Sequence, residues 1–304
     1  MRKRITLVRG SVTGAACIVR LVLLCLIIPL VSACSALRIG YEFVPRYAAW
    51  QLDRYWELDS AQASFSKERI DELWRWHRHS ELPEYARWLR SLNGGLDASV
   101  DIVEVTNWRR MLIRYWRVTA LRVAPDVSEL IVSLRPQQID HMKQRLASAN
   151  EDYKQEFLPH DPAMRQARRI KRIEERLEYY FGPLMDVQRD IVRRMAGAMP
   201  RNEQVWFEER LARQKDFVDL AERLGRFGPS PTAAQREEAA RLVTDYLVSL
   251  WEPRDPKRRQ ALESVMLASD EITVAVFNAA LAEQKARLSE RLLGLAADFE
   301  ALSR

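Results

Sequence analysis

Four histidines lie outside the N-terminal segment and could in principle bind a metal: His77, His79, His141 and His160. His77 and His79 are two residues apart on a predicted helix, so their rings point to different faces, whereas a helical metal pair needs positions i and i+4. We therefore expect no metal site. Surface or capping roles suit these histidines better, with His77 able instead to stack among neighbouring tryptophans.

Carboxylates near aromatic residues are the second candidate for chemistry. Glu72, Glu81 and Glu84 have this setting, and a glycan hydrolase needs two carboxylates that flank the bond to be cleaved. Nothing in the sequence places two of them at the required separation. The chain also lacks a Gly-rich phosphate loop, a Gly-x-Ser-x-Gly elbow and a His-Glu-x-x-His motif. We expect no catalytic residues, no cofactor and no enzymatic activity.

The N-terminus has the layout of a secretory signal. Five basic residues precede Cys34, no acidic residue occurs before Glu42, and residues 21–37 are apolar or small and uncharged. A membrane-spanning helix needs roughly 20 apolar residues. The uncharged run approaches that length but contains Pro29 and small residues near its end. A retained membrane helix is therefore the less favoured alternative.

The last residues of this segment, Val31-Ser32-Ala33-Cys34, resemble the lipobox of bacterial lipoproteins. The resemblance implies cleavage between Ala33 and Cys34, removal of residues 1–33, and lipidation of Cys34, with the lipid holding the protein to a membrane. Several acyl chains anchor more firmly than one. Ser35, in place of the Asp that retains many lipoproteins at the inner membrane, favours the periplasmic face of the outer membrane.

Cleavage at this site would change the meaning of the composition. The chain has a net charge of +6 and an isoelectric point of about 9.3. Removing the five basic residues ahead of Cys34 leaves about +1, so the basic balance does not indicate a nucleic-acid partner. Cys17 and Cys25 lie in the same segment. The mature chain would then have no disulfide and no cysteine ligands for a metal.

The remaining sequence predicts an all-α fold. We expect a short membrane-proximal linker over residues 34–44, followed by a single domain over 45–304, an irregular antiparallel bundle of about nine to ten helices. Capping and breaking residues place these helices at 45–58, from 59 through a break and restart at 80–84 to 93, 98–122, 136–157, 162–181, 184–198, 202–224, 232–251, from 255, and from 269 to the C-terminus.

A glutamine recurs at the start of four predicted helices. The pairs are Leu58/Gln62, Leu134/Gln138, Leu184/Gln188 and Thr232/Gln235. Their spacings are too uneven for a solenoid. Capping of the helix starts is the simplest explanation.

Together these residues resemble a family of uncharacterised proteobacterial lipoproteins, a domain of unknown function that follows a lipobox. The resemblance covers the mature chain and carries no activity. It rests on Cys34-Ser35-Ala36-Leu37-Arg38, Leu52-Asp53-Arg54-Tyr55, Leu58-Asp59 with Gln62, Trp76-His77-Arg78, Glu81-Leu82-Pro83, Tyr85-Ala86, Phe181-Gly182-Pro183-Leu184 with Gln188, and Ala297-Asp298-Phe299.

A weaker likeness is to periplasmic helical chaperones with Leu-Thr-x-x-Gln helix starts. Thr232-Ala233-Ala234-Gln235 keeps the Thr-x-x-Gln part and lacks the leucine. The starts at Gln138 and Gln188 keep leucine and glutamine and lack the threonine.

Aromatic residues are concentrated early in the domain, where seven of the nine tryptophans lie between Trp50 and Trp116. A buried core cluster is the plain interpretation. The alternative is a groove near the membrane, because Trp and Tyr suit both lipid interfaces and extended ligands. The candidate binding surface comprises Trp50, Tyr55, Trp56, Trp74, Trp76 and Trp88.

A basic stripe runs along the predicted helix 162–181. Its residues, Arg165, Arg169, Arg172 and Arg176, follow the spacing i, i+4, i+7, i+11. Glutamates alongside favour a solvated face with pairs inside the helix. The functional alternative is a docking site for an anionic partner.

The sequence leads us to expect a lipid-anchored, non-enzymatic interaction or scaffold protein of the cell envelope, with an unidentified envelope protein as partner. A holdase-like chaperone and an envelope enzyme acting on peptidoglycan or lipid are the alternatives. A concave apolar face with basic rims would favour the chaperone. Facing carboxylates in a cleft would favour the enzyme, and a flat or convex surface the scaffold.

Overall fold

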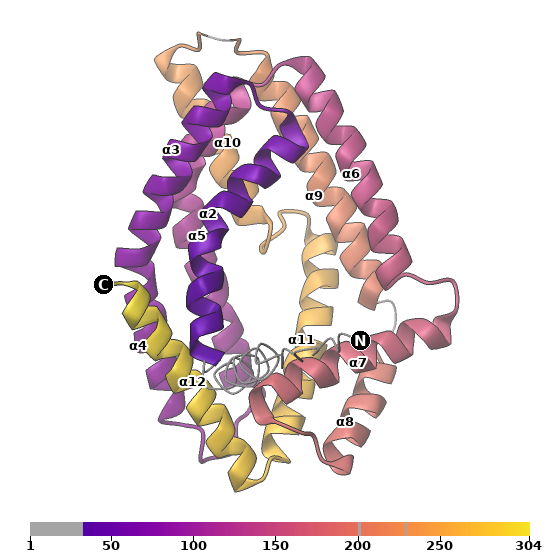
Figure 1. The fold of residues 1–304 in the computed structure, drawn as a ribbon. Coiled ribbons are helices and arrows are strands. Elements are labelled where there is room, and N and C mark those ends of the chain that lie inside the picture. Colours follow the sequence, from indigo (N-terminus) through magenta and orange to yellow (C-terminus); the bar gives the residue numbers. More distant parts are fainter. Residues whose placement is uncertain (1–32, 200–201, 229) are drawn as a thin grey trace, which may run out of the picture. The chain divides into compact units, whose positions relative to one another are not determined.

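The computed structural model describes residues 33–304 except 200, 201 and 229. The chain divides into two units between Phe43 and Val44. In the first unit the described residues, 33–43, all belong to helix α2. The predicted signal at 1–33 therefore lies outside the described residues except for Ala33. The second unit, residues 44–304, holds all the other described elements (Figure 1).

All elements among the described residues are helices, which confirms the predicted all-α class. A π-turn, η2 (His77–Glu81), joins α3 to α4 without a break, and counting that rod once gives ten helices. The bounds are α2 Ala33–Trp56, α3 Ser60–Trp76, α4 Leu82–Asn93, α5 Ile102–Val132, α6 Pro136–Phe157, α7 Pro162–Phe181, α8 Asp186–Gly197, α9 Asn202–Gly225, α10 Ala233–Ser249, α11 Pro256–Asn278 and α12 Ala282–Leu302.

Side-chain caps begin many of these helices where the sequence predicts them. Asp59 accepts a hydrogen bond from the backbone N–H of Gln62, and Thr232 accepts one from Gln235. Asp161 and Asp255 cap α7 and α11, each followed by proline at the first helical position. These contacts satisfy backbone N–H groups that have no partner inside the helix.

Proline misled the prediction at two places. Residues 34–44 were predicted as a linker before a helix beginning at Pro45, but α2 runs from Ala33 to Trp56 with Pro45 inside it. Likewise α5 was predicted to end at residue 122 but continues through Pro125 to Val132. Proline removes one backbone hydrogen bond. In α5 the residues after it, Leu130 and Ile131, are buried, and that apolar burial offsets the loss.

The end of the chain also differs from the prediction. Ser269 and Asp270 were expected to begin the last helix, yet both lie within α11. Asp270 is buried and accepts a hydrogen bond from Nε of Arg109 at 2.8 Å. The actual break lies between Asn278 and Ala282, and α12 begins there. Asp270, which the sequence suggested as part of a helix start, instead forms an ion pair between α11 and α5.

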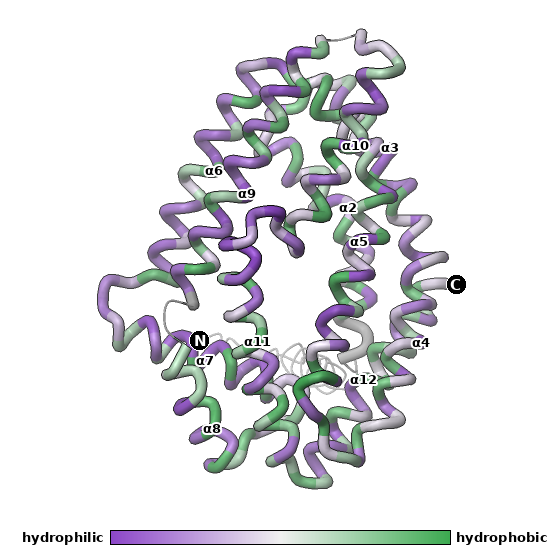
Figure 2. Tube along the Cα trace, turned by 180° about the vertical axis from the view of Figure 1, so that it is seen from behind, coloured by the Kyte–Doolittle hydropathy of each residue, from purple (hydrophilic) through white to green (hydrophobic). Residues whose placement is uncertain are grey.

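The second unit has two hydrophobic cores. Core 1 is built from α4, the first part of α5, α7, α8, α11 and α12, with Phe277 and Val276 fully buried. Core 2 is built from the end of α2, the second part of α5, α6, α9 and α10. Helix α5 packs along α10, and α4 packs along α12. Along α6 and α9, hydrophilic and hydrophobic residues alternate as expected for helices with one buried face (Figure 2).

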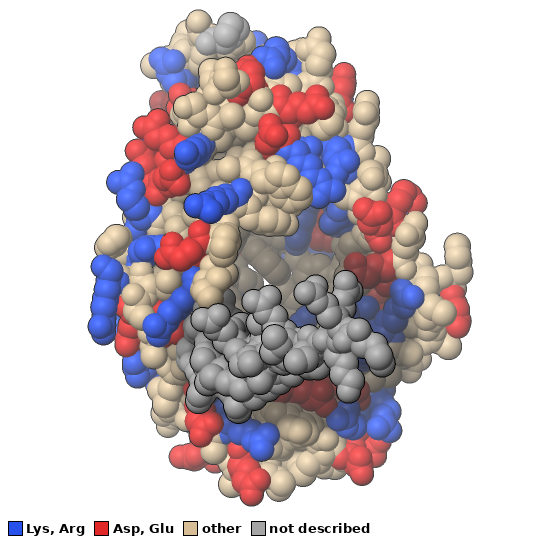
Figure 3. Space-filling view, viewed as in Figure 1, with Lys and Arg blue, Asp and Glu red and all other residues tan. Residues whose placement is uncertain are grey.

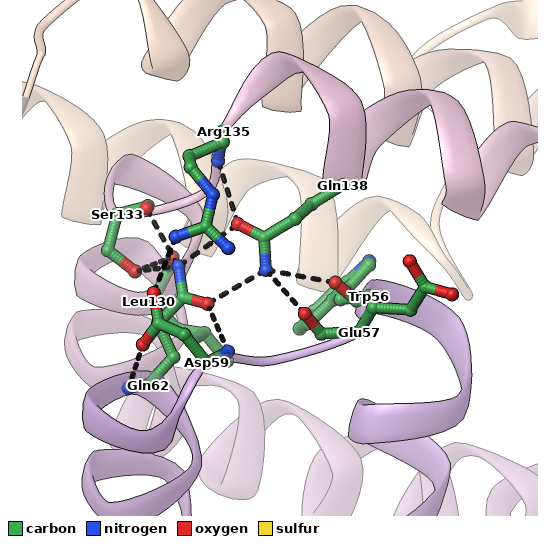
Figure 4. Close-up of polar contacts among 8 residues, drawn as sticks. All are labelled: Trp56, Glu57, Asp59, Gln62, Leu130, Ser133, Arg135 and Gln138. Atoms are coloured by element: carbon green, nitrogen blue, oxygen red, sulfur yellow. Dashed lines mark hydrogen bonds and ion pairs between the residues drawn. The ribbon is translucent and has the colours of Figure 1, made fainter.

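Two glutamines at helix starts face each other next to core 2 (Figure 4). Gln62 and Gln138 exchange amide hydrogen bonds, 3.2 Å from Nε2 of Gln62 and 2.8 Å from Nε2 of Gln138. Each also accepts the backbone N–H of its own N-cap residue. Nε2 of Gln138 further donates to the carbonyls of Trp56 and Glu57, and Nε2 of Gln62 to that of Ser133.

Core 1 repeats this arrangement with Gln188 at the start of α8 and Gln284 at the start of α12. Their amides exchange hydrogen bonds of 3.0 Å in both directions. Each accepts the backbone N–H of its N-cap residue, Met185 or Leu281. Capping thus explains the recurring glutamine, as the sequence indicated. The pairing across helices was not anticipated, and neither was the role of Gln284.

Candidate binding cavity

An apolar cavity of about 770 Å³ lies in the part of the second unit that contains core 1. Its walls come from α4, α5, α7, α11 and α12, of which α4, α7 and α12 lie in the lower half of Figure 1. This volume falls within the range of about 300–1,000 Å³ that is usual for pockets binding small molecules. Leu112 on α5 lines the cavity and is 56% exposed, so the cavity reaches the surface beside this residue.

Aromatic side chains from every wall face the cavity. Those of α4 and α5 are Tyr85, Trp88, Trp108, Tyr115 and Trp116, and those of α7, α11 and α12 are Tyr180, Phe181, Phe277 and Phe299. Several hold one another in place, since the rings of Tyr85 and Tyr115 lie 4.5 Å apart and Trp88 meets Tyr115 edge-on at 5.9 Å. Aliphatic residues fill the rest of the surface. Such a lining suits an apolar ligand.

His77 contributes to the cavity from the π-turn η2. Its ring stacks on Trp74 at 5.5 Å and meets Tyr85 edge-on at the same distance. The sequence offered this stacking as an alternative to a surface role, and stacking is what occurs. π-turns inside helices are frequent at functional sites.

The cavity wall is electrically almost neutral. Burial lowers the pKa of His77, which keeps its ring uncharged at neutral pH. Burial, with Glu81 nearby, raises the pKa of Tyr85 to about 12, and burial also raises the pKa values of Tyr115 and Tyr180. As far as the structure describes the chain, no Asp or Glu lines the cavity. Arg176 is its charged residue.

The four arginines of the predicted basic stripe have separate environments. Arg165 donates to the carbonyls of Pro159 and His160. Arg169 is buried, donates to the carbonyl of Met199 and lies 3.5 Å from Glu203, which Arg172 also approaches at 3.4 Å. Arg176 is exposed and lines the cavity. The arginines therefore do not form one free basic surface, and the pairs they make join helices rather than residues within α7.

The six nominated aromatic residues are also dispersed. Trp88 lines the cavity. Trp56 is buried in core 2 and stacks on Phe217, and Tyr55 packs against the same core. Trp74 and Trp76 surround His77, while Trp50 is 52% exposed on α2. Core packing thus accounts for Trp56 and Tyr55, whereas Trp88 lies in the cavity wall.

Among the described aromatic residues of the cavity wall, only Trp88 belongs to the binding surface predicted from the sequence. Six residues of this helix have helical spacing in the sequence, namely Val105, Trp108, Leu112, Tyr115, Trp116 and Thr119, and all of them except Val105, which is buried in core 1, line the cavity. That spacing predicts one apolar face and does not reveal whether the face meets another helix or a cavity. The convergence of α7, α11 and α12 on it depends on tertiary structure.

The histidines and carboxylates considered in the sequence do not come together in one site among the described residues. Among the described residues no group of three His, Cys, Asp or Glu side chains could hold a metal ion. Glu81 is buried, and burial together with nearby Glu84 raises its pKa. On the face drawn in Figure 3, acidic and basic residues are interspersed over its described part.

Two observations concern the N-terminal region. Cys34 lies in the first turn of α2. No helix among the described residues is both long enough and apolar enough to cross a membrane.

Comparison with known proteins places the chain in a family. No curated protein and no solved structure gives a match. The family model described as "Family of unknown function (DUF6279)" matches residues 54–237. The match includes the cavity walls from α4, α5 and α7, whereas those from α11 and α12 lie beyond it. Since this is more than half of the sequence, the chain belongs to the DUF6279 family.

Proposed function

We propose that this protein binds a ligand with a long apolar chain in the aromatic cavity of its second unit. One observation carries the proposal: a cavity of about 770 Å³ whose wall is aromatic and aliphatic and whose tyrosines and histidine are uncharged. Removing an apolar chain from water releases roughly 25 cal/mol for each Å² buried. The rings are already held by their neighbours, so binding would require little ordering.

The cavity favours a binding role over the alternatives raised by the sequence. A scaffold needs only an outer surface, so it gives no reason for an apolar cavity. A hydrolase of the two-carboxylate kind would need acids in the cleft, and no described lining residue is an acid. A holdase for unfolded polypeptides shares the apolar surface and the basic residue at the rim. It is therefore kept as an outcome of the binding test.

The binding test compares two leucines of α5. Leu112 lines the cavity and is 56% exposed, whereas Leu121 is 53% exposed and does not line it. Leu112→Glu places a charge where the apolar chain would lie, and we expect it to weaken binding by about tenfold or more. Leu121→Glu should leave binding unchanged. Neither change removes a buried contact, so both variants should fold.

The probe is dibromostearate, since bromine quenches tryptophan fluorescence on contact and Trp88, Trp108 and Trp116 line the cavity. The chain, purified as the host cell processes it, is placed in nanodiscs and titrated. Saturable quenching that Leu112→Glu weakens selectively supports the proposal. Equal quenching in both variants overturns it. Suppression of protein aggregation that Leu112→Glu alone removes, without quenching, supports the holdase instead.

We propose further that a lipid on Cys34 anchors the protein at the periplasmic face of the outer membrane. The lipobox resemblance of residues 31–34 motivates this. On α2, Tyr47 and Trp50 are exposed with their rings 5.6 Å apart, and Arg54 lies over the Trp50 ring at 5.3 Å. Exposed Trp, Tyr and Arg are suited to a membrane–water interface.

Metabolic labelling with a palmitate analogue tests the anchor. We expect strong labelling of the wild type and loss of that labelling in Cys34→Ala, with accumulation of the uncleaved precursor. Ser35→Ala is the matched control, and it should label like the wild type. Equal labelling of wild type and Cys34→Ala would exclude the proposed attachment site.

A further inference from the structure

The charges around the cavity indicate which class of amphiphile it accepts. Histidine and tyrosine side chains in the wall are neutral, and no described lining residue is acidic. Arg176 on α7 is the positive charge at the cavity. Because Arg176 both lines the cavity and is exposed, it lies at the rim, where a polar head group would be placed when the chain is inside.

Arg176 also differs from the other arginines of its helix. Arg165 and Arg168 donate to backbone carbonyls, while Arg169 and Arg172 approach Glu203. Within the described part of the chain, Arg176 has neither an ion pair nor a hydrogen bond. Its positive charge acts on Tyr180: burial raises the pKa of this tyrosine, and Arg176 lowers it to a smaller extent.

The nearest acids on α7 are already engaged. Glu174 and Glu178 both pair with Arg189 of α8, at 3.4 and 2.5 Å, and Glu175 lies 3.7 Å from Lys171. An anion from outside the chain would therefore meet little competition for Arg176. A guanidinium also binds carboxylates and phosphates with two parallel hydrogen bonds.

We infer that the cavity takes a single-chain amphiphile with an acidic head group, which Arg176 binds at the rim. The inference rests on the proposed function, since it requires the apolar chain to occupy the cavity. Carboxylate and phosphate monoester head groups share the necessary chemistry. The inference predicts discrimination by charge among ligands that have the same chain.

The experiment titrates the processed chain in nanodiscs with dibromostearate and with its methyl ester. Arg176→Gln should weaken binding of the acid roughly fivefold, as for a partly exposed ion pair, and leave binding of the ester unchanged. Arg176→Lys should recover part of the loss, because it keeps the charge without the planar pair of donors. Lys171→Gln is the control, since its side chain is 76% exposed on the same helix.

The outcomes separate the two claims. If neither the acid nor the ester quenches the cavity tryptophans, the proposed function fails. If both bind and Arg176→Gln affects them equally or not at all, the cavity binds apolar chains but the head-group inference is wrong. Selective weakening of the acid supports the inference, and the phosphate monoester of the same alcohol then shows which acidic head group binds more tightly.

Discussion

Replacing Gln138 by glutamate should lower the free energy of unfolding by about 3 kcal/mol, although the two side chains have nearly the same shape. Gln138 is 4% exposed, and its Nε2 donates to Oε1 of Gln62 and to the carbonyls of Trp56 and Glu57 at 2.8–3.0 Å. A carboxylate would turn these three attractions into contacts between acceptors. It would also be buried, and the neighbouring Arg135 already pairs with Asp59 at 2.6 Å.

The loss of stability in Gln138→Glu is larger because Gln138 also binds the turn at Glu57. Glu57, whose carbonyl it binds, has φ of 46°, a left-handed conformation that is uncommon for residues other than glycine. Figure 4 shows the amide directed at this turn, between the end of α2 and the start of α3. Without the hydrogen bond to Glu57, part of the energy that maintains the strained turn is lost.

Gln235→Glu provides the matched control. Gln235 has the same position in the capping box of α10 and accepts the N–H of Thr232 at 2.8 Å, but it is paired with no glutamine among the described residues. Glutamate serves equally well in a capping box. We therefore expect Gln235→Glu to change the free energy of unfolding by less than about 0.5 kcal/mol.

Urea denaturation followed by circular dichroism measures both variants. The pH dependence supplies a second readout for Gln138→Glu. Burial raises the folded-state pKa of the introduced carboxyl above its unfolded value, so the destabilisation is complete above the folded pKa and decreases as the pH falls through it. A Gln138→Glu variant as stable as Gln235→Glu at neutral pH would show that the glutamine pair contributes little.

The glutamines also show how far the sequence could predict this fold. Gln62, Gln138 and Gln188 were recognisable as helix starts because capping depends on residues three apart. Their partners lie 76 or 96 residues away, and no local pattern reports such a distance. Gln284 follows Leu281 without a capping side chain, so its helix start was placed at Ser269 instead.

The cavity was predictable only in part for a related reason. Helical spacing on α5 defined the face that carries Trp108, Leu112 and Tyr115. Packing α7 and α12 against that face could have filled the space between them, and amphipathic periodicity is the same in either case. Arg176 was noticed through its spacing with other arginines. Its distinct position became visible only when the partners of Arg169 and Arg172 were known.

The second large effect concerns Arg258, which connects α11 to α9. Its guanidinium contacts both oxygens of Glu209, at 2.9 and 3.1 Å, and Oδ2 of Asp216 at 2.7 Å. Hydrogen bonds to Glu209 are the main cause that holds the pKa of Arg258 above its ordinary value. Later residues of α11 belong to core 1, and Leu220 and Leu224 of α9 belong to core 2. This ion pair therefore connects helices that serve different cores.

Arg258→Met should reduce the free energy of unfolding by about 2–3 kcal/mol. The side chain of Glu209 is 4% exposed, and removing one partner of a buried pair leaves a charge without full compensation. Arg213 stays 2.8 Å from Glu209, which keeps the loss toward the lower end of the range for such pairs. Arg254→Met is the control. The Arg254 side chain is 73% exposed, so its ion pair with Asp245 lies at the surface and should contribute less than about 1 kcal/mol.

A double variant distinguishes the effect of the uncompensated charge on Glu209 from a simple loss of packing. If the uncompensated charge of Glu209 causes the instability, then adding Glu209→Met to Arg258→Met should restore part of the lost stability, because the 4% exposed carboxylate is removed, whereas Arg213, which then loses this partner, is 22% exposed. If the missing bulk of Arg258 causes it, the second change should add a further loss.

Because α9 and α11 serve different cores, Arg258→Met should also separate the denaturation transition into two steps. Trp56 of core 2 and Trp108 beside core 1 should then change environment at different urea concentrations. A single transition with unchanged slope would mean that α5, which runs through both cores, is sufficient to couple them.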